Sequence, residues 1–565
     1  MHIKGILVLA AALTAGVSSS GTLRILPLGD SITYGQGWDP HGGYRAVLRE
    51  KLVAAGYDVD YVGNETRNQG TLKESGDVEH EGHPGWRVDQ IAKMLPIWSG
   101  SFDAPHAILL MIGTNNCNGN HDAVMAQMRA LLDEIALIHP SAVTVVATLP
   151  PFLNGRSVGG NNVWVEDQNK LIRAEVAQRA AKGGKVRLAD VYPAVSPTEG
   201  MNDDRHPNKT GYIAMAQVWF DALKAAFPNP AAIPADVAAT AVHAKLDGES
   251  GKVTVWFSRP IDAASAKVAN FACKTVKWAS AAVADDARSV TLTPARPLKP
   301  GVAHAISVKG VKSGRTSVVP RTFTLAFYPR GARNYVPEAA RYRKVYGYDI
   351  PSAGGALNKN GVKYALDDHE KVGKFSRIAY YVELVDATGA LKYLWVSMDA
   401  FTDDASKIAV PTKQSGAFFQ QYVANMRVYS NVPTVDPGEK ARGNIEFWPF
   451  AYYPSRQKGL HVEGASDKVY DVDDSCNMSG GFACMQIHDT DALKPLFCYN
   501  NWGDNAGGTC DLGLGPNPSG NPDWTQSGGG NSWPGGRKLE VYVMEGASRP
   551  ASGSGVPSTS RVKAK

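Results

Sequence analysis

The sequence predicts an α/β fold, with a parallel sheet between helices, for its N-terminal part, followed by two β-rich parts. Up to residue 227, short apolar runs alternate with stretches whose apolar residues recur at helical spacing. The short runs are mostly apolar, as in parallel strands that are buried on both faces. Beyond the Pro/Ala-rich segment 228–234, apolar and polar residues alternate with period two, which is typical of antiparallel strands.

The α/β part begins with a buried strand at 23–28, which Gly29 ends. The polar, glycine-bearing segment 64–83 predicts a loop. Four further short segments predict the other strands: 58–62, 107–112, 143–149 and 186–191. Five amphipathic stretches predict helices: 43–55, 88–95, 123–138, 162–181 and 210–226.

Residues 235–327 predict a small immunoglobulin-like β-sandwich, and residues 328–546 a further β-rich domain. In the sandwich the period-two strands are expected at 253–257, 289–293, 304–308 and 322–327. In the last domain they are expected at 379–385, 392–398, 444–449 and 538–544, the first two forming a hairpin around the turn 386–389. Aromatic residues of this domain are either core or a sugar-stacking platform. They are Trp395, Trp448, Tyr452, Tyr453, Trp502, Trp524 and Trp533.

Both ends of the chain differ in character from the rest. Lys4, the apolar run 5–17 and the small residues 18–21 predict a signal peptide over residues 1–20, and therefore a secreted, extracellular protein whose first domain spans 21–228. No later run reaches the 18 apolar residues of a membrane span. The Ser/Gly/Pro-rich segment 547–565 predicts a disordered tail.

Four of the six cysteines fall close together in the last domain. In an exported chain this spacing favours two disulfides over a zinc site, and no CxxC pair is present. Local pairing, 476–484 with 498–510, is one of three possible connectivities. The four residues are Cys476, Cys484, Cys498 and Cys510.

Charge argues against nucleic acid as a partner. The formal net charge is only +5 over 565 residues, and no basic stripe is present.

Three residue types of nucleophilic catalysis follow the ends of predicted strands. Ser31 follows the first strand directly, and a serine needs a histidine to accept its proton and a carboxylate to orient that histidine. Asp203 and His206, three residues apart, precede the last predicted helix. We expect these three residues to be catalytic.

An acyl-transfer site also needs donors for the oxyanion. The candidates are the backbone N–H groups of Ser31 and Gly85 and the side-chain amide of Asn115. Substrate contacts are expected of Trp86 and Arg45, with Asn154 also near the acyl pocket. For these three, a place in the core or on a helix surface is an equal alternative.

These residues stand in an ordered series of motifs, namely Gly29-Asp30-Ser31, Gly85, Gly113-Thr114-Asn115 and Asp203-x-x-His206. The series resembles the four blocks of the SGNH (GDSL-type) hydrolase superfamily. Residues 27–35, 42–45 and 81–86 resemble more narrowly carbohydrate esterase family three, which comprises acetylxylan and related polysaccharide deacetylases. Pro84 and Asn116 depart from the serine and aspartate usual there.

The resemblance implies a flavodoxin-like SGNH domain and a serine esterase that removes O-acetyl groups from a polysaccharide. The partner would be an acetylated polysaccharide or another O-acylated glycan, and the chemistry needs no cofactor and no metal. Two alternatives stay open. One is a sialate or pectin O-acetylesterase or a lipid acyl hydrolase of the same superfamily, and the other is an extracellular glycan-binding protein or adhesin with an incidental esterase domain.

Three competing motifs are less favoured. Ser157 lies in a GxSxG pattern, but Pro150-Pro151 and the residues after them separate it from the preceding strand, so it lacks the strand–turn–helix setting of a nucleophile elbow. Asp204 is the alternative to Asp203. His80 and His83, with Asp77, lack the spacing of a zinc-binding HExxH motif.

Overall fold

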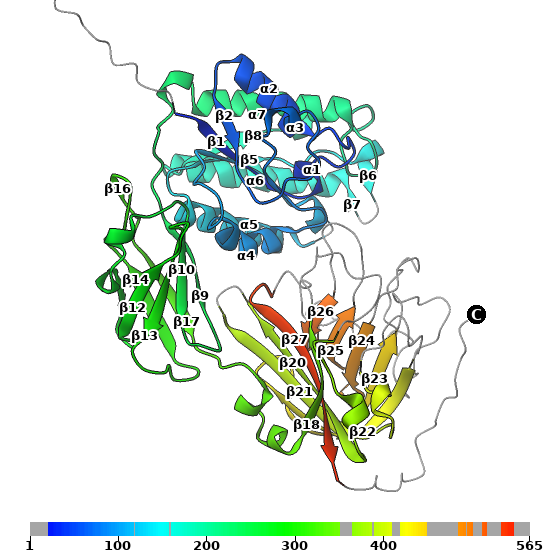
Figure 1. The fold of residues 1–565 in the computed structure, drawn as a ribbon. Coiled ribbons are helices and arrows are strands. Elements are labelled where there is room, and N and C mark those ends of the chain that lie inside the picture. Colours follow the sequence, from blue (N-terminus) through cyan, green and yellow to red (C-terminus); the bar gives the residue numbers. More distant parts are fainter. Residues whose placement is uncertain are drawn as a thin grey trace, which may run out of the picture.

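The computed structural model describes residues 21–117, 119–157, 160–350, 364–386, 389–409, 419–448, 484–492, 494–500, 511–516 and 533–546. The expected signal peptide and tail lie outside these ranges. Within them, no helix combines the length and the hydropathy that crossing a bilayer requires. An α/β unit, a two-sheet unit and a large antiparallel sheet follow one another along the chain (Figure 1). The domain boundaries themselves stay predictions.

The α/β unit contains a six-stranded sheet with the order β2-β1-β4-β5-β8, with β3 paired to β1. Every pairing in it is parallel. This is the order of flavodoxin-like folds, in which ligands bind where the strand order reverses, here between β1 and β4. The strands are β1 (Leu23–Gly29), β2 (Val59–Tyr61), β3 (Glu81–Gly82), β4 (Ala107–Met111), β5 (Val143–Ala147) and β8 (Val186–Ala189).

Helices cover both faces of this sheet, which confirms the α/β prediction (Figure 1). Leu23 and Ile25 of β1 belong to a core cluster with α2 and α7, whereas Leu26 and Leu28 pack on the other face with α4, α5 and α6. Successive residues of one strand thus serve opposite layers. The helices are α1 (Ser31–Tyr34), α2 (Tyr44–Ala54), α3 (Leu72–Ser75), α4 (Val88–Trp98), α5 (His121–Ile138), α6 (Asn162–Ala181) and α7 (Lys209–Ala226).

The second unit is a sandwich of the antiparallel sheets β12-β13-β10-β9 and β11-β14-β17 around one apolar core. Only four of its strands were expected from the sequence. Its strands are β9 (Ala241–Leu246), β10 (Val253–Phe257), β11 (Phe271–Cys273), β12 (Trp278–Val283), β13 (Ser289–Pro294), β14 (Ala303–Val308) and β17 (Arg321–Ala326), with a small hairpin of β15 (Lys312–Ser313) and β16 (Thr316–Ser317).

The sandwich contacts the α/β unit just before β4. Ala104 N donates to Ser258 O at 3.0 Å, and Arg288 pairs with Asp103. Arg321 Nη2 lies 2.8 Å from Glu134 Oε1. Because the segment before β4 lies at the amino ends of the parallel strands, the sandwich leaves their carboxyl ends uncovered.

The third unit is a ten-stranded antiparallel sheet, β19-β18-β27-β20-β21-β22-β23-β24-β25-β26, in which β27, the last strand of the described residues, lies between β18 and β20. The strands are β18 (Arg343–Asp349), β19 (Leu366–Asp367), β20 (Phe375–Val385), β21 (Leu391–Asp399), β22 (Phe419–Ser430), β23 (Gly438–Trp448), β24 (Cys484–Asp489), β25 (Lys494–Asn500), β26 (Asp511–Leu514) and β27 (Gly536–Glu545).

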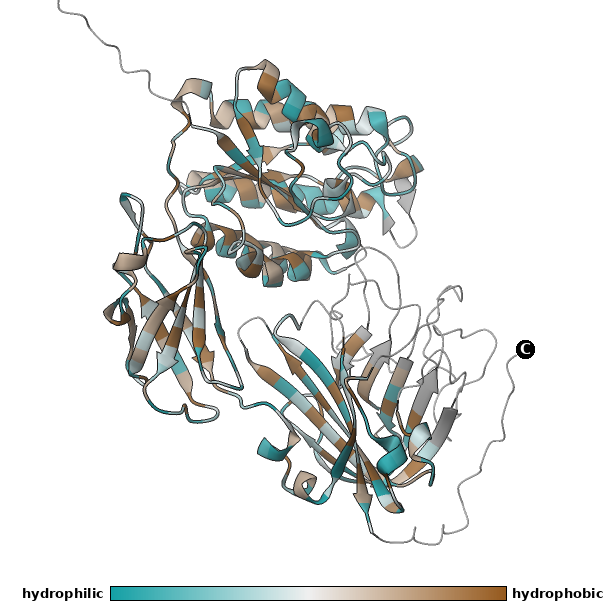
Figure 2. Ribbon diagram, viewed as in Figure 1, coloured by the Kyte–Doolittle hydropathy of each residue, from teal (hydrophilic) through white to brown (hydrophobic). Residues whose placement is uncertain are grey.

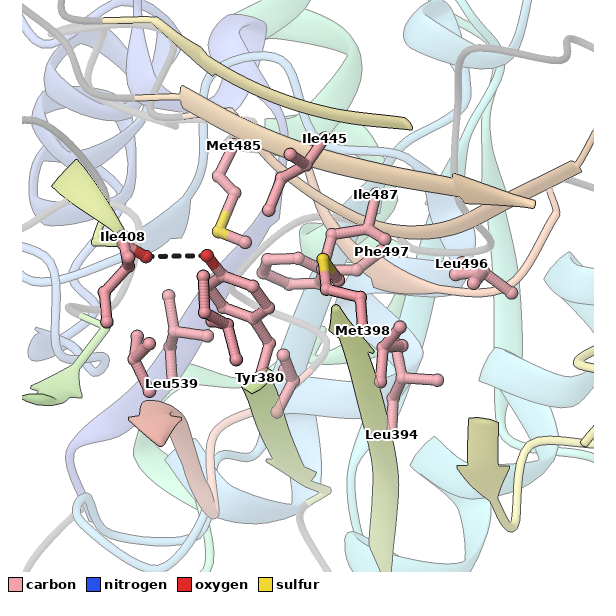
Figure 3. Packing of buried hydrophobic residues seen from close by; sticks show 14 of the residues in the cluster. Tyr380, Leu394, Met398, Ile408, Ile445, Met485, Ile487, Leu496, Phe497 and Leu539 are labelled. Atoms are coloured by element: carbon pink, nitrogen blue, oxygen red, sulfur yellow. Dashed lines mark hydrogen bonds between the residues drawn. The ribbon is translucent and has the colours of Figure 1, made fainter. Parts of the chain in front are cut away.

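One face of the ten-stranded sheet carries the largest apolar cluster of the described residues. Apolar and polar bands alternate along its strands (Figure 2), as expected where one face is buried. In the core, Tyr380 lies among Met398, Met485 and Phe497, and its hydroxyl donates to the Ile408 carbonyl at 2.7 Å (Figure 3). The buried hydroxyl therefore has a partner.

The sequence predicts sugar-stacking aromatic residues and disulfide-bonded cysteines in this part of the chain. Trp395 is fully buried and its indole N–H donates to Glu338 at 2.7 Å, so it cannot stack on a sugar. Trp533 is partly buried against the core. Tyr452, Tyr453, Trp502 and Trp524 lie outside the described residues, as do Cys476 and Cys510, and the side chains of Trp448 and Cys484 are not described. Cys498 is buried on β25, and the disulfides stay a prediction.

Candidate active site

Ser31 stands at the carboxyl end of β1, where the chain turns directly into α1. The side chain of Asp30 caps this helix by accepting from Ile32 N at 3.0 Å. Gly29 lets β1 approach β4 closely, since a Cβ there would lie 2.1 Å from the Met111 carbonyl oxygen. Ser31 is thus held at the reversal of strand order between β1 and β4.

His206 bridges Ser31 and Asp203. Its Nε2 lies 2.9 Å from Ser31 Oγ, and its Nδ1 lies 2.9 Å from both carboxylate oxygens of Asp203. The backbone N–H groups of Arg205 and His206 also donate to Asp203 Oδ1 at 2.9 Å. The arrangement suits a serine whose proton passes to an oriented imidazole.

The pKa of Asp203 reflects these contacts. Partial burial acts to raise it, but the hydrogen bonds from Arg205 N and from the His206 ring and backbone together hold this pKa below its ordinary value. Asp204 instead lies 3.8 Å from Arg205 Nε, and its carbonyl accepts from Leu153 N. Of the two carboxylates, Asp203 is the one that contacts His206.

Gly37 packs closely against the backbone and Cβ of the segment that carries His206. Its φ is +94°, and a Cβ there would lie 2.6 Å from Pro207 O and 2.8 Å from His206 Cβ. Glycine is therefore required for this close approach.

The two other oxyanion candidates lie on loops beside Ser31. Gly29 pairs with Gly82 of β3 on one side and with Met111 of β4 on the other, so the loops after β3 and β4 flank the serine. Gly85 is exposed. Asn115, in a short 3-10 turn, donates through Nδ2 to Trp86 O at 2.9 Å, which joins the two loops.

The expected substrate contacts are placed differently. Arg45 is fully buried, and its guanidinium donates to the carbonyls of Thr33, Tyr34, Asn68 and Val78 at 2.8–3.3 Å. These hydrogen bonds connect the segment 64–80 to α1. The expectation that Arg45 contacts substrate is therefore wrong.

Trp86 does not stand open to a substrate pocket either, whereas Asn154 is exposed. Trp86 is 5% exposed and stacks on His83, so it supports the loop rather than standing open to substrate. Asn154 has a φ of +52°, and its backbone N–H donates to Pro197 O. The core alternative fits Trp86 better than a substrate contact.

The competing motifs have other structural settings. Ser157 belongs to β6 (Arg156–Ser157), which pairs with β7 (Gly160–Asn161) in a separate two-stranded sheet. His80 accepts from Gly82 N, and Asp77 pairs with Arg49 and accepts from Tyr61 N.

The segment 64–83, expected to be a loop throughout, contains α3 and β3. Glu81 of this segment and Asp30 stand in the sequence motifs, but sequence reasoning assigned no role to either residue. Glu81 stands beside a glycine in a polar segment that also carries Asp77 and Glu79, so the sequence gives no indication that Glu81 is buried.

Comparison with known proteins agrees with this geometry. Residues 28–214 match the GDSL-like lipase/acylhydrolase family. This part of the chain is a GDSL-type (SGNH) esterase/acylhydrolase domain.

Among curated proteins, a multidomain esterase of Ruminococcus flavefaciens is similar to this chain, with 31% identity over 230 residues. The match covers 37% of this chain and 29% of the relative, so the chain spans less than a third of that relative's length.

Two solved structures are similar to the GDSL-type domain. One is a family 3 carbohydrate esterase of Clostridium thermocellum, with 29% identity, 36% of this chain and 94% of the other covered, and a TM-score of 0.31. The second is a carbohydrate esterase of family 3 from Talaromyces cellulolyticus, with 26% identity, coverage of 36% and 96%, and a TM-score of 0.30.

Asp30 of the GDSL-type domain is fully buried, and within the described residues its Oδ2 has no hydrogen-bond partner. Burial raises the pKa of this carboxyl to about 7, against the opposing effect of the Ile32 N–H bond and the Arg205 charge. The folded protein therefore holds a proton that the unfolded chain, with an ordinary Asp pKa of about 3.9, has already lost between about pH 4 and pH 7. Stability from this group falls as pH rises through that window.

We predict that Asp30→Asn removes this dependence, because an amide keeps the cap to Ile32 N without titrating. The melting temperatures of wild type and variant, measured from about pH 4 to pH 8, should shift in the variant's favour as pH rises. Parallel pH profiles would show that Asp30 does not titrate in this range.

Proposed function

We propose that this chain is a secreted serine esterase that removes O-acetyl groups from a polysaccharide. The observation that carries the proposal is the unbroken hydrogen-bonded series from Ser31 Oγ through His206 to Asp203, with distances of 2.9 Å, at the strand-order reversal of the sheet. The assignment of the domain as an esterase does not depend on which ester is its natural substrate.

In the proposed reaction, His206 Nε2 takes the proton of Ser31 while Oγ attacks the acetyl carbonyl. The backbone N–H groups of Ser31 and Gly85 and the second amide hydrogen of Asn115 hold the oxyanion. His206 then protonates the departing sugar oxygen, which leaves acetyl-Ser31. A water molecule that gives its proton to His206 cleaves this ester, which releases acetate and restores Ser31.

A hydroxyl-rich substrate is supported by the surroundings of the serine. The segment 64–69 beside α1 is polar, and Arg67 pairs with Glu65 on its surface. The motifs at residues 27–35, 42–45 and 81–86 resemble those of polysaccharide deacetylases. Secretion follows from the signal-like residues 1–20.

The role of Ser31 is tested with p-nitrophenyl acetate. We predict that Ser31→Ala lowers kcat by at least about 10⁴-fold, since the nucleophile cannot be replaced. Ser157→Ala is the matched control and should keep the wild-type rate. Full activity of Ser31→Ala, or loss of activity in Ser157→Ala, would contradict the assignment.

The substrate class is tested by acetate release from a panel of esters. We expect the highest kcat/KM on acetylated xylan, ahead of acetylated pectin and O-acetyl sialic acid, and only slow hydrolysis of long-chain acyl esters. Preference for the long-chain esters would instead identify a lipid acyl hydrolase.

A further inference from the structure

A second histidine–carboxylate pair lies directly beside the proposed oxyanion hole. Glu81 of β3 is fully buried next to β1. One carboxylate oxygen accepts from Asn64 N at 2.8 Å and Asn64 Nδ2 at 2.9 Å, and the other lies 2.7 Å from His83 Nε2. A buried carboxylate is costly without such partners, so the bond to His83 is strongly favoured.

His83 is in turn packed against two indoles. Its ring centroid lies 4.5 Å from that of Trp86 and 4.3 Å from that of Trp98 on α4. Its backbone N–H donates to Gly29 O at 2.9 Å, and its carbonyl accepts from Trp86 N at 3.2 Å. The turn 83–86 is thus attached both to the end of β1 and to α4.

This turn carries the donors of the oxyanion. Gly85 has a φ of +80°, and the site of a Cβ on it has no neighbour within 4 Å, so the residues on either side must hold its N–H in place. Trp86 O accepts from Asn115 Nδ2 at 2.9 Å, and Asn116 Oδ1 accepts from Val88 N at 3.2 Å. A series of contacts therefore runs from Glu81 through His83 and Trp86 to Asn115.

We propose that Glu81 and His83 are positioning residues that set the oxyanion hole of Gly85 and Asn115. Neither touches the reacting atoms; the hydrogen bond between the buried Glu81 and the His83 side chain holds the turn in place. The inference rests on the proposed function, because it assigns these residues to the stabilisation of the tetrahedral intermediate.

Two substitutions of His83 separate the hydrogen bond from the ring packing. His83→Phe keeps an aromatic ring against Trp86 and Trp98 but cannot donate to Glu81. His83→Gln loses the ring but places an amide N–H near the position of Nε2. We expect His83→Phe to lower kcat on p-nitrophenyl acetate by about 10- to 100-fold with KM nearly unchanged, less than or comparable to the loss of a whole oxyanion donor. His83→Gln should recover most of this loss.

The affinity for a small alkylboronic acid distinguishes a positioning role of His83 from a contribution to folding alone. Its tetrahedral adduct with Ser31 places an oxygen in the oxyanion hole, so its Kd, measured by calorimetry, should rise in His83→Phe by the factor by which kcat falls. A smaller folded fraction would lower the rate and the stoichiometry but leave the Kd unchanged. Should His83→Phe fold poorly, Glu81→Gln tests the pair from the other side, with the same expected rise in Kd.

The matched control is His369→Phe. His369 Nδ1 lies 2.6 Å from Asp367 and its ring stacks on Tyr346, but this pair belongs to the ten-stranded sheet. This variant should keep the wild-type kcat and Kd. Wild-type behaviour of His83→Phe, or a greater loss in His83→Gln than in His83→Phe, would overturn the proposal. Failure of the proposed function would appear separately, as hydrolysis that survives Ser31→Ala.

Discussion

The site depends on the close approach of three parallel strands at the carboxyl end of β1. Gly29 pairs with Gly82 on one side and Met111 on the other, and only a residue without a side chain fits between Met111 O and Thr33 Oγ1. This contact fixes the start of α1, and with it Ser31. The loops after β3 and β4 therefore flank the serine. His206, which is 175 residues further along the chain, lies within hydrogen-bond distance of it.

The order of strands and helices in the α/β unit could be predicted from the sequence because most of its strands are largely apolar segments between helical patterns. The hydrophobic layers on both faces of the sheet enforce that pattern. β3 could not be predicted, since two residues carry no periodicity, yet it brings Gly85 to β1. The insertion of β27 between β18 and β20 is likewise a long-range pairing that no local pattern specifies.

For the site, sequence reasoning identified residues that follow strand ends, because such residues converge at one edge of a parallel sheet. It misjudged residues whose meaning depends on burial. Arg45 resembled a substrate-binding group, but its guanidinium donates hydrogen bonds to four backbone carbonyls in the interior. Trp395 resembled a sugar platform but lies in the core. Glu81 was part of a family motif but had no role assigned to it, although it is fully buried next to the turn 83–86.

Whether Ser31 forms a covalent acyl-enzyme can be determined by trapping that species. The protein is mixed with p-nitrophenyl acetate, quenched in acid within the first turnover, digested and examined by mass spectrometry. We expect a single acetyl group on the peptide that contains Ser31, absent when the ester is omitted. Acetylation of Ser157 instead, or release of one equivalent of nitrophenol with no acetylated Ser31, would contradict it.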